Sequence, residues 1–161
     1  MSAPTFRIIT DWRVKGRLAD VVRLLTKVED FPRWWGNVHA AVVPRGPDTF
    51  AVRSRAILPL RWQARVIEAA PPHRFVIEAS GGLAGRGIWH LRQAGDVVEI
   101  EFDWQPAHRP RLGWLTVWSH RRAMSCGQSA LRAEMARINR IGTMSGVADH
   151  TTLRPGLPAV Q

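Results

Sequence analysis

Hydrophobic and polar residues alternate with a period of two along the central part of the chain, residues 38–105. The clearest stretch is DVVEIEFDWQP, in which Val98, Ile100, Phe102 and Trp104 share one face and acidic residues occupy the other. Such alternation is typical of antiparallel strands with one face in solvent and the other covered. The pattern predicts about six consecutive antiparallel strands in this region.

The phase of the alternation assigns each side chain to a face of the predicted sheet. The predicted inward set upstream of residue 98 is Phe50, Val52, Ser54, Ala56, Trp62, Ala64, Val66, Phe75, Ile77, Ala79, Trp89 and Leu91. The predicted outward, solvated set includes Arg53, Arg55, Arg61, Arg65, Glu99, Glu101 and Asp103. The stretches PRGPD, PPH, GGLAG and AGD carry turn residues between strands, and Pro59 in LPL predicts a bend or tight hairpin.

The pattern before residue 38 differs. Residues 5–14 are rich in β-branched and aromatic side chains and predict a first strand. An amphipathic helix is predicted next, from apolar residues at three- and four-residue spacing: Leu18, Val21, Val22, Leu25 and Val28. We expect Pro32 to end this helix. The stretch FPRWWGNV then predicts a short second helix or turn that stops near Gly36.

The period returns to helical after residue 112, and WSHRRAMSCGQSALRAEMARI is the best helix candidate in the chain. Its stripe is Val117, His120, Met124, Gly127, Leu131, Met135 and Ile138. A glycine inside a helix costs about 1 kcal/mol relative to alanine, so Gly127 indicates close packing or a space that the protein needs. Residues 142–161 show no strong period and predict a loosely ordered tail, which places the predicted domain at residues 1–141.

The order of the elements predicts an α+β fold. An antiparallel sheet with one apolar face must be covered, and only the C-terminal helix is long enough to lie across it. We therefore expect a curled sheet of about seven strands wrapped around that helix, with two short helices after the first strand. A curled sheet that grips a single helix leaves room for a cavity between them.

Five stretches in this order resemble the START-like (SRPBCC) superfamily, and within it the polyketide cyclase/dehydrase-like proteins: FPRWWGNV, LP, GGLAGRGIWHL, EIEFDW and SHRRAMSCGQSAL. The resemblance runs from Phe6 to about Ile141. It implies a helix-grip fold of the START/Bet v 1-like kind, whose cavity takes lipids, sterols, polyketides or plant hormones. Some members are cyclases or aromatases and many have no shown activity, so the resemblance implies a ligand class but no reaction.

Eight tryptophans and no tyrosine are present. Trp62, Trp89 and Trp104 fall on inward positions, where with Phe75 and Phe102 they either fill a solid core or wall a pocket for flat, ring-shaped ligands. We favour the pocket, because so many large rings are hard to pack without gaps.

The other candidates flank this predicted pocket. Trp35 is placed to close one end of it, whereas Trp34 is interpreted as a surface or staple residue. Met124 is expected to form an adaptable wall, and Gly127 makes room either for a ligand or for a facing tryptophan. The predicted ligand-binding residues are Trp35, Ser54, Trp62, Phe75, Trp89, Phe102, Trp104, His120, Met124 and Gly127.

His120 has two interpretations. Its ring either bonds a backbone carbonyl or water near the start of the helix, or it supplies a polar contact that orients a ligand and can move a proton. We predict that His120→Ala leaves the fold intact and weakens ligand binding, as measured by fluorescence titration. Unchanged affinity would exclude the polar-contact role.

Other catalytic signals are weak, so His120 is the single catalytic candidate. Ser119 is its neighbour, and adjacent helix positions point about 100° apart, which makes a poor nucleophile–base pair. His90 and His108 lack metal-ligand spacing. GGLAGRG is better read as a hairpin than as a nucleotide loop. We therefore expect no metal and no cofactor, and we expect Cys126 to be a buried, inert thiol.

The formal charge of +10, from 23 basic and 13 acidic residues, raises the question whether the protein binds nucleic acid. The arginines are spread from Arg7 to Arg154 without a basic block or a groove-reading motif, so no specific nucleic-acid partner is expected. No apolar run reaches a membrane span of about 20 residues. The absence of a signal peptide and the single cysteine predict a cytoplasmic protein. We expect a monomer or a homodimer.

The prediction from the sequence is thus a domain that binds a small hydrophobic ligand, such as a lipid, an aromatic or a polyketide-like molecule. Two alternatives stay open. One is a polyketide cyclase or dehydratase that uses the same cavity, which requires at least two polar groups converging inside. The other is a basic module that binds anionic surfaces through scattered arginines, which salt would weaken steeply.

Overall fold

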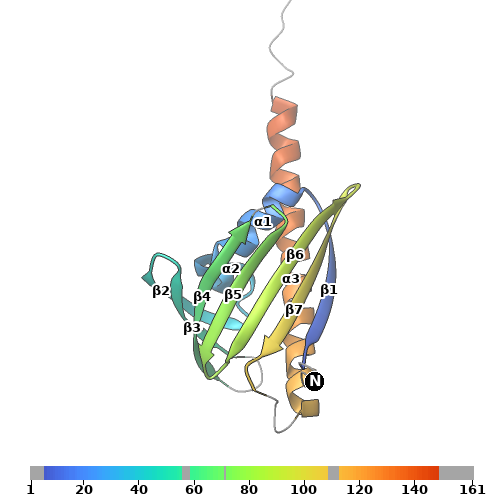
Figure 1. The fold of residues 1–161 in the computed structure, drawn as a ribbon. Coiled ribbons are helices and arrows are strands. Elements are labelled where there is room, and N and C mark those ends of the chain that lie inside the picture. The colour runs from blue at the N-terminus through green and yellow to red at the C-terminus, as the bar shows by residue number, and fades with distance from the viewer. Residues whose placement is uncertain (1–5, 56–58, 71, 109–112, 149–161) are drawn as a thin grey trace, which may run out of the picture.

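One antiparallel sheet and one long helix make up most of the computed structural model (Figure 1). The structure describes residues 6–55, 59–70, 72–108 and 113–148. Its elements in chain order are β1 (Ile8–Lys15), α1 (Leu18–Thr26), the 3-10 helix η1 (Val28–Asp30), α2 (Phe31–Trp34), β2 (His39–Gly46), β3 (Thr49–Ser54), β4 (Leu60–Ala70), β5 (Arg74–Gly81), β6 (Gly85–Ala94), β7 (Val97–Pro106) and α3 (Gly113–Ala148).

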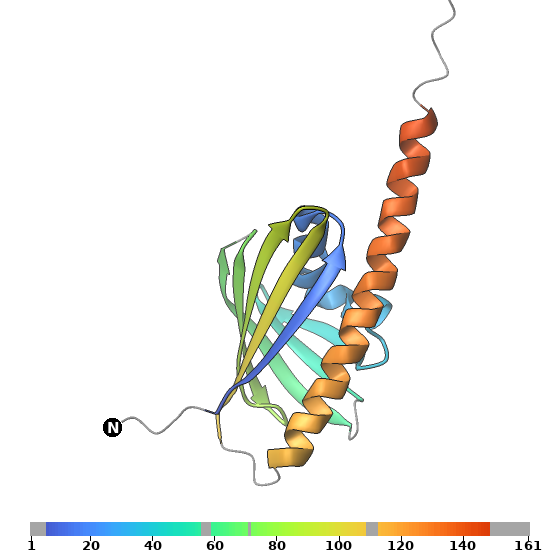
Figure 2. The ribbon, with the colours of Figure 1, turned by 90° about the vertical axis from the view of Figure 1, so that its right-hand side faces the viewer.

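The sheet has seven strands in the order β1-β7-β6-β5-β4-β3-β2. Strands β2 to β7 form a continuous antiparallel meander, and β1 closes the series by pairing with β7 along its whole length. The sheet is curled, and α3 lies on its concave side (Figure 2). The predicted α+β helix-grip architecture is therefore confirmed.

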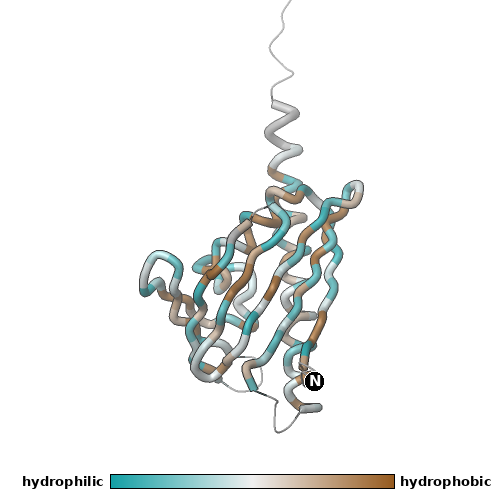
Figure 3. The backbone as a smooth tube through the Cα atoms, viewed as in Figure 1, coloured by the Kyte–Doolittle hydropathy of each residue, from teal (hydrophilic) through white to brown (hydrophobic). Residues whose placement is uncertain are grey.

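The predicted faces of the strands are also confirmed, and hydrophobic and polar segments alternate along them (Figure 3). On β7, Val98, Ile100, Phe102 and Trp104 are buried on the concave side. The arginines assigned to the outer face of β3 and β4 are exposed. Ala56 lies outside the described residues, together with the other residues just before the bend predicted at Pro59.

Asp103 differs from the prediction that it is solvated, because its side chain is only 3% exposed. Arg7 Nε donates to Asp103 Oδ1 at 3.0 Å, and Gln105 Nε2 donates to Oδ2 at 2.8 Å. Burial alone would raise the pKa of this carboxyl group, but the hydrogen bonds from Arg7 and Gln105 outweigh it and the pKa is lowered. A buried carboxylate on the outer face is thus held in its charged form by the chain segment before β1.

The first helical region is shorter than predicted. Helix α1 ends at Thr26, and Pro32 lies in the first turn of α2 instead of ending the helix before it. Proline fits that position because the first N–H groups of a helix have no partner within it. Trp34 is buried, with 8% of its surface exposed, so the surface interpretation of this residue is wrong.

Helix α3 continues to Ala148, past the boundary predicted at residue 141. Its last turns extend beyond the sheet (Figure 2). Residues 149–161 of the predicted tail lie outside the described residues. No helix in the described part of the chain is long and apolar enough to cross a bilayer.

An ion-pair cluster joins α2 to α3. Arg33 Nη1 donates to Glu134 Oε1 at 2.6 Å, and Arg137 Nη2 donates to the same oxygen at 2.7 Å. The Glu134 side chain is 10% exposed. The hydrogen bond from Arg137, followed by that from Arg33, outweighs burial and lowers the pKa of Glu134 to about 2.

Because the folded pKa of Glu134 lies below its ordinary value of 4.5, its contribution to stability is complete above that value and is lost as the pH falls toward 2. We predict that Glu134→Gln lowers the free energy of unfolding at pH 7 by about 1–2 kcal/mol and removes this acid-dependent part. Urea unfolding at several pH values measures both. The matched control is Glu29→Gln, which changes an exposed glutamate. Equal losses in the two variants would contradict the prediction.

Candidate functional site

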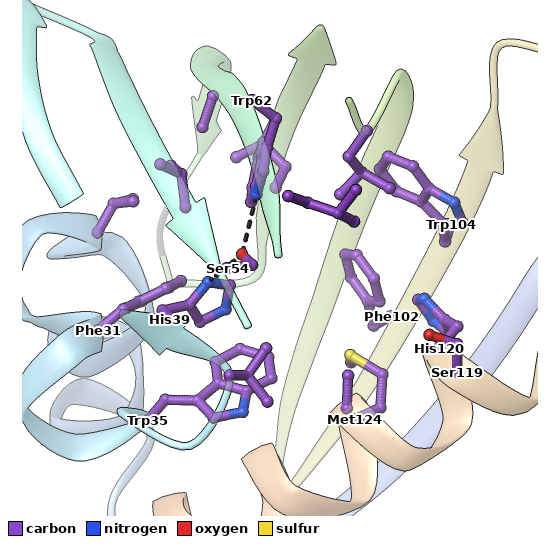
Figure 4. A pocket seen from close by; sticks show the side chains of 18 of the residues that line it. Phe31, Trp35, His39, Ser54, Trp62, Phe102, Trp104, Ser119, His120 and Met124 are labelled. Carbon is purple, nitrogen blue, oxygen red and sulfur yellow. Dashed lines mark hydrogen bonds between the residues drawn. The ribbon is translucent and has the colours of Figure 1, made fainter. Parts of the chain in front are cut away.

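A cavity of about 370 Å³ lies between the concave face of the sheet and the first half of α3. Side chains from α2, from strands β2 to β7 and from α3 line it (Figure 4). Its aromatic lining consists of Phe31, Trp35, Trp62, Phe75, Trp89, Phe102 and Trp104. The large rings therefore wall the space and leave it open, as the favoured interpretation of the sequence requires.

The aromatic wall on β5, β6 and β7 is built by strand register. Phe75 is the cross-strand partner of Trp89, and Trp89 is the partner of Phe102. The Phe75 and Trp89 rings stack with their centroids 5.6 Å apart, and the Trp89 and Phe102 centroids are 4.3 Å apart. Directly opposed side chains in neighbouring strands are close enough for such contacts, so the sheet presents a continuous aromatic surface to the cavity.

All the predicted ligand-binding residues except Gly127 line this cavity. Gly127 is buried elsewhere in the interface between α3 and the aromatic core. A Cβ atom built on Gly127 would lie 2.4 Å from Trp35 Cζ2 and 2.8 Å from Trp12 Cη2. Of the two predicted roles for this glycine, the structure shows room for a facing tryptophan. Cys126, the residue before it, is half-buried, so the expectation of a fully buried thiol is wrong.

His120 stacks on the aromatic wall from α3. Its ring centroid lies 5.9 Å from that of Phe102 and 6.4 Å from that of Trp104, and the planes are 14° and 21° apart. Its Nε2 atom is buried without a hydrogen-bond partner among the described residues. Burial lowers the pKa of His120 to about 4. A neutral imidazole with an unpaired nitrogen therefore borders the cavity, while its role in ligand binding stays a prediction.

His39 is a second buried histidine of the site, which the sequence pattern does not single out. It is 7% exposed, and its Nδ1 lies 3.2 Å from Ser54 Oγ. Trp62 Nε1 donates to the same Ser54 oxygen at 3.0 Å. The three residues come from β2, β3 and β4 and lie on the side of the cavity opposite His120 and Trp104 (Figure 4). Burial lowers the pKa of His39 to about 4.

A β-bulge explains why His39 is missed. The β2–β3 register pairs Val42 with Val52 and Ala41 with Arg53, but it then shifts so that His39 opposes Ser54. Counting back from the Val42–Val52 pair without this shift would pair Ser54 with Ala40 and send His39 to the outer face. The backbone N–H of His39 also donates to Trp35 O at 3.0 Å, which ties the start of β2 to the end of α2.

The cavity lining contains no Asp, Glu, Lys or Arg among the residues that the structure describes. Its two histidines are neutral at pH 7, because burial lowers the pKa of each to about 4. An ionised ligand group would lose its hydration there without a countercharge, which is unfavourable. The site thus suits an uncharged, mostly apolar molecule with few polar atoms.

The polar lining provides hydroxyl and imidazole groups on two walls. Ser54 and His39 are in contact on one wall, and Ser119 and His120 border the cavity from α3. Within the described ranges, no three His, Cys, Asp or Glu side chains gather in an arrangement that could hold a metal ion. The chemistry available from these residues is hydrogen bonding and proton transfer through neutral groups.

A curled antiparallel sheet that grips one long helix around an apolar cavity defines the helix-grip class of folds. No family model and no curated protein sequence matches the chain. Solved structures do match. A START superfamily protein from Mycobacterium smegmatis superposes with a TM-score of 0.73 at 10% identity, over 82% of this chain and 98% of that chain.

Two further structures are similar. The Aha1 dimer from Colwellia psychrerythraea matches with a TM-score of 0.61 at 13% identity, over 79% of this chain and 96% of that one. CalU16 from Micromonospora echinospora matches with a TM-score of 0.57 at 15% identity, over 88% and 86%. The chain therefore has the START-like (SRPBCC) fold, as the sequence stretches predicted.

Proposed function

We propose that this protein reversibly binds a small, uncharged hydrophobic ligand in the cavity between the sheet and α3. The observation that carries the proposal is the open cavity of about 370 Å³ with an aromatic, uncharged lining. The START-like fold supports a ligand-binding cavity in this place, while the identity of the ligand rests on the lining of this chain.

The size of the cavity is compatible with useful affinity. Burial of apolar surface contributes about 25 cal/mol per Å², so a ligand that buries a few hundred Å² gains several kcal/mol. Micromolar binding corresponds to about 8 kcal/mol after the entropic cost of association is met. Because association itself costs at least about 4 kcal/mol, this affinity requires the burial of about 500 Å² of apolar surface, counted on the ligand and the cavity wall together, and no ion pair.

The catalytic alternative has the polar groups that it needs, because His39 and His120 border one cavity from opposite walls. Their low pKa values make both imidazoles weak bases at neutral pH. A cyclase or dehydratase of this kind would also need a polar chain folded between the two walls. Binding without turnover fits an uncharged and predominantly apolar lining better.

The scattered basic charge offers less support for an anionic surface as partner. Much of it is offset by carboxylates on the same molecule, for example at Arg65–Glu78, Arg74–Glu68 and Arg13–Glu99. Ion pairs of this kind are distributed over the outer surface of the domain. Salt separates the two modes, because cavity binding does not require charge neutralisation and electrostatic binding weakens steeply with salt.

The test combines identification and titration. Native mass spectrometry of the purified protein, followed by solvent extraction, identifies any molecule that copurifies. Quenching of tryptophan fluorescence then measures binding of uncharged ring compounds, lipids and polyketides at low and high salt. We expect saturable binding that is nearly independent of salt. Absence of saturable binding by every uncharged compound would overturn the proposal.

A matched pair of variants tests whether the ligand binds in this cavity. Ala123 lines the cavity from α3, whereas Ala133 lies on the exposed face of the same helix. Ala123→Phe introduces a phenyl ring at the cavity wall and is expected to weaken binding at least tenfold. Ala133→Phe makes the same chemical change in solvent and is expected to leave affinity unchanged. Equal affinities of the two variants would contradict binding in this cavity.

A further inference from the structure

We propose that His39, Ser54 and Trp62 form a hydrogen-bond-donor subsite that holds a carbonyl oxygen of the ligand. This inference rests on the proposed function and narrows the ligand to an uncharged, ring-containing ketone, ester or lactone. These three side chains together form the polar triad.

The polar triad has three hydrogen-bond donors but only two internal hydrogen bonds. Trp62 Nε1 has one N–H, the Ser54 hydroxyl has one O–H, and a neutral His39 ring has one N–H. These donors supply two internal hydrogen bonds, Trp62 Nε1 to Ser54 Oγ at 3.0 Å and the 3.2 Å contact between Ser54 Oγ and His39 Nδ1. One proton is therefore left without an internal acceptor.

The position of that proton depends on the tautomer of His39, but its existence does not. If the Ser54 hydroxyl donates to Nδ1, the ring carries its proton on Nε2. If Nδ1 donates to Ser54 Oγ, the hydroxyl proton itself is spare. Both atoms belong to residues that line the cavity. A hydrogen bond from a donor that faces the cavity to an acceptor on the ligand contributes about 0.5–1.5 kcal/mol, so an acceptor in the cavity would be held there.

The triad is packed among buried side chains, which favours a defined ligand contact. The His39 ring lies against Trp35 with centroids 4.6 Å apart at 85° and against Phe31 with centroids 5.4 Å apart. Ser54 is 6% exposed and accepts from Trp62 on the neighbouring strand. A donor that is fixed before binding loses little conformational entropy when the ligand arrives.

The acceptor must be uncharged, because the described lining has no cationic side chain to pair with a carboxylate or phosphate. A carbonyl oxygen meets this requirement and accepts a single strong hydrogen bond. The remainder of the ligand then extends toward Phe102, Trp104 and Met124 on the other side of the cavity (Figure 4). The structure thereby assigns the oxygen-bearing end to β2–β4 and the apolar end to β7 and α3.

The experiment compares the binding of two rigid three-ring molecules, 9-fluorenone and fluorene. Fluorenone has a carbonyl group at the position where fluorene has a methylene group. Fluorescence titration measures both dissociation constants in the full chain. The His39→Phe/Ser54→Ala double variant removes both candidate donors, and the His90→Phe/Ser80→Ala control makes the same two changes at exposed positions outside the cavity. His120→Phe, measured alongside, tests the imidazole on the opposite wall. We expect the ratio of fluorenone to fluorene affinity to fall about five- to tenfold in the double variant and to stay unchanged in the control.

The outcomes separate the subsite from the proposed function. Binding of both molecules with the same ratio in wild type and double variant overturns the subsite and leaves cavity binding intact. A ratio that falls only in His120→Phe also overturns it, because the donor then lies on the other wall. Failure of the wild type to bind any uncharged ring compound overturns both proposals.

A spectroscopic measurement on the wild type keeps the test decisive if the double variant does not fold. A hydrogen bond weakens the C=O bond, so the infrared stretching frequency of bound fluorenone should lie below its value in hexane, both in the wild type and in His120→Phe, which lacks the imidazole on the opposite wall. A frequency equal to that in hexane would show that the carbonyl has no donor and would overturn the subsite.

Discussion

Gly127→Ala is expected to lower the free energy of unfolding by about 1–3 kcal/mol, although alanine is the better helix former. The added Cβ would lie 2.4 Å from Trp35 Cζ2, 2.5 Å from Trp35 Cε2 and 2.8 Å from Trp12 Cη2. These rings are buried and contact one another, with centroids 5.7 Å apart, so neither can move without disturbing the core. Urea unfolding measures the loss.

The same variant should weaken ligand binding, because Trp35 also lines the cavity. Gly142→Ala is the matched control, since it lies in the same helix and a Cβ built there has no heavy atom within 4 Å. We expect this control to raise stability by up to about 1 kcal/mol, because alanine is the better helix former, and to keep wild-type affinity. A Gly127→Ala protein as stable as the control would show that α3 does not pack against Trp35 as described.

Acidification from pH 7 to pH 4.5 is expected to destabilise the protein through its two buried histidines. The pKa of each is about 4 in the folded state, against an ordinary value of 6.5. Between these values the unfolded chain binds protons that the folded protein does not, so stability falls as the pH is lowered. Each histidine contributes up to about 3 kcal/mol by pH 4, at 1.36 kcal/mol per unit of pKa.

Single variants separate the contributions of the two histidines to this pH dependence. His39→Phe and His120→Phe should each reduce the slope of unfolding free energy against pH between 6.5 and 5, a window above the titration of the Glu134 cluster. Trp62→Phe removes a hydrogen bond to Ser54 without removing a titrating group, so it should lower stability while keeping the wild-type slope. A wild-type slope in both histidine variants would show that the imidazoles are not buried in neutral form.

The inward aromatic residues were predictable because a strand places successive side chains on opposite faces, a property of local backbone geometry. This rule correctly assigned Trp62, Trp89 and Trp104 to the concave side. The same rule does not predict that His39 faces the cavity, because a bulge in β2 reverses the face on which this residue lies. It placed Asp103 on the outer face correctly but did not predict its burial, because the arginine that bonds it there lies in the segment before β1.

The sequence by itself determined the order of the elements, the two faces of the sheet and the apolar stripe of the last helix. These features depend on residues close together in the chain, whose spacing reports the backbone conformation directly. Only the tertiary structure decided that Trp35 occupies the space beside Gly127, that His39 meets Ser54, and that the cavity stays open between them. Those outcomes depend on strand register and on packing between distant segments, which no local period encodes.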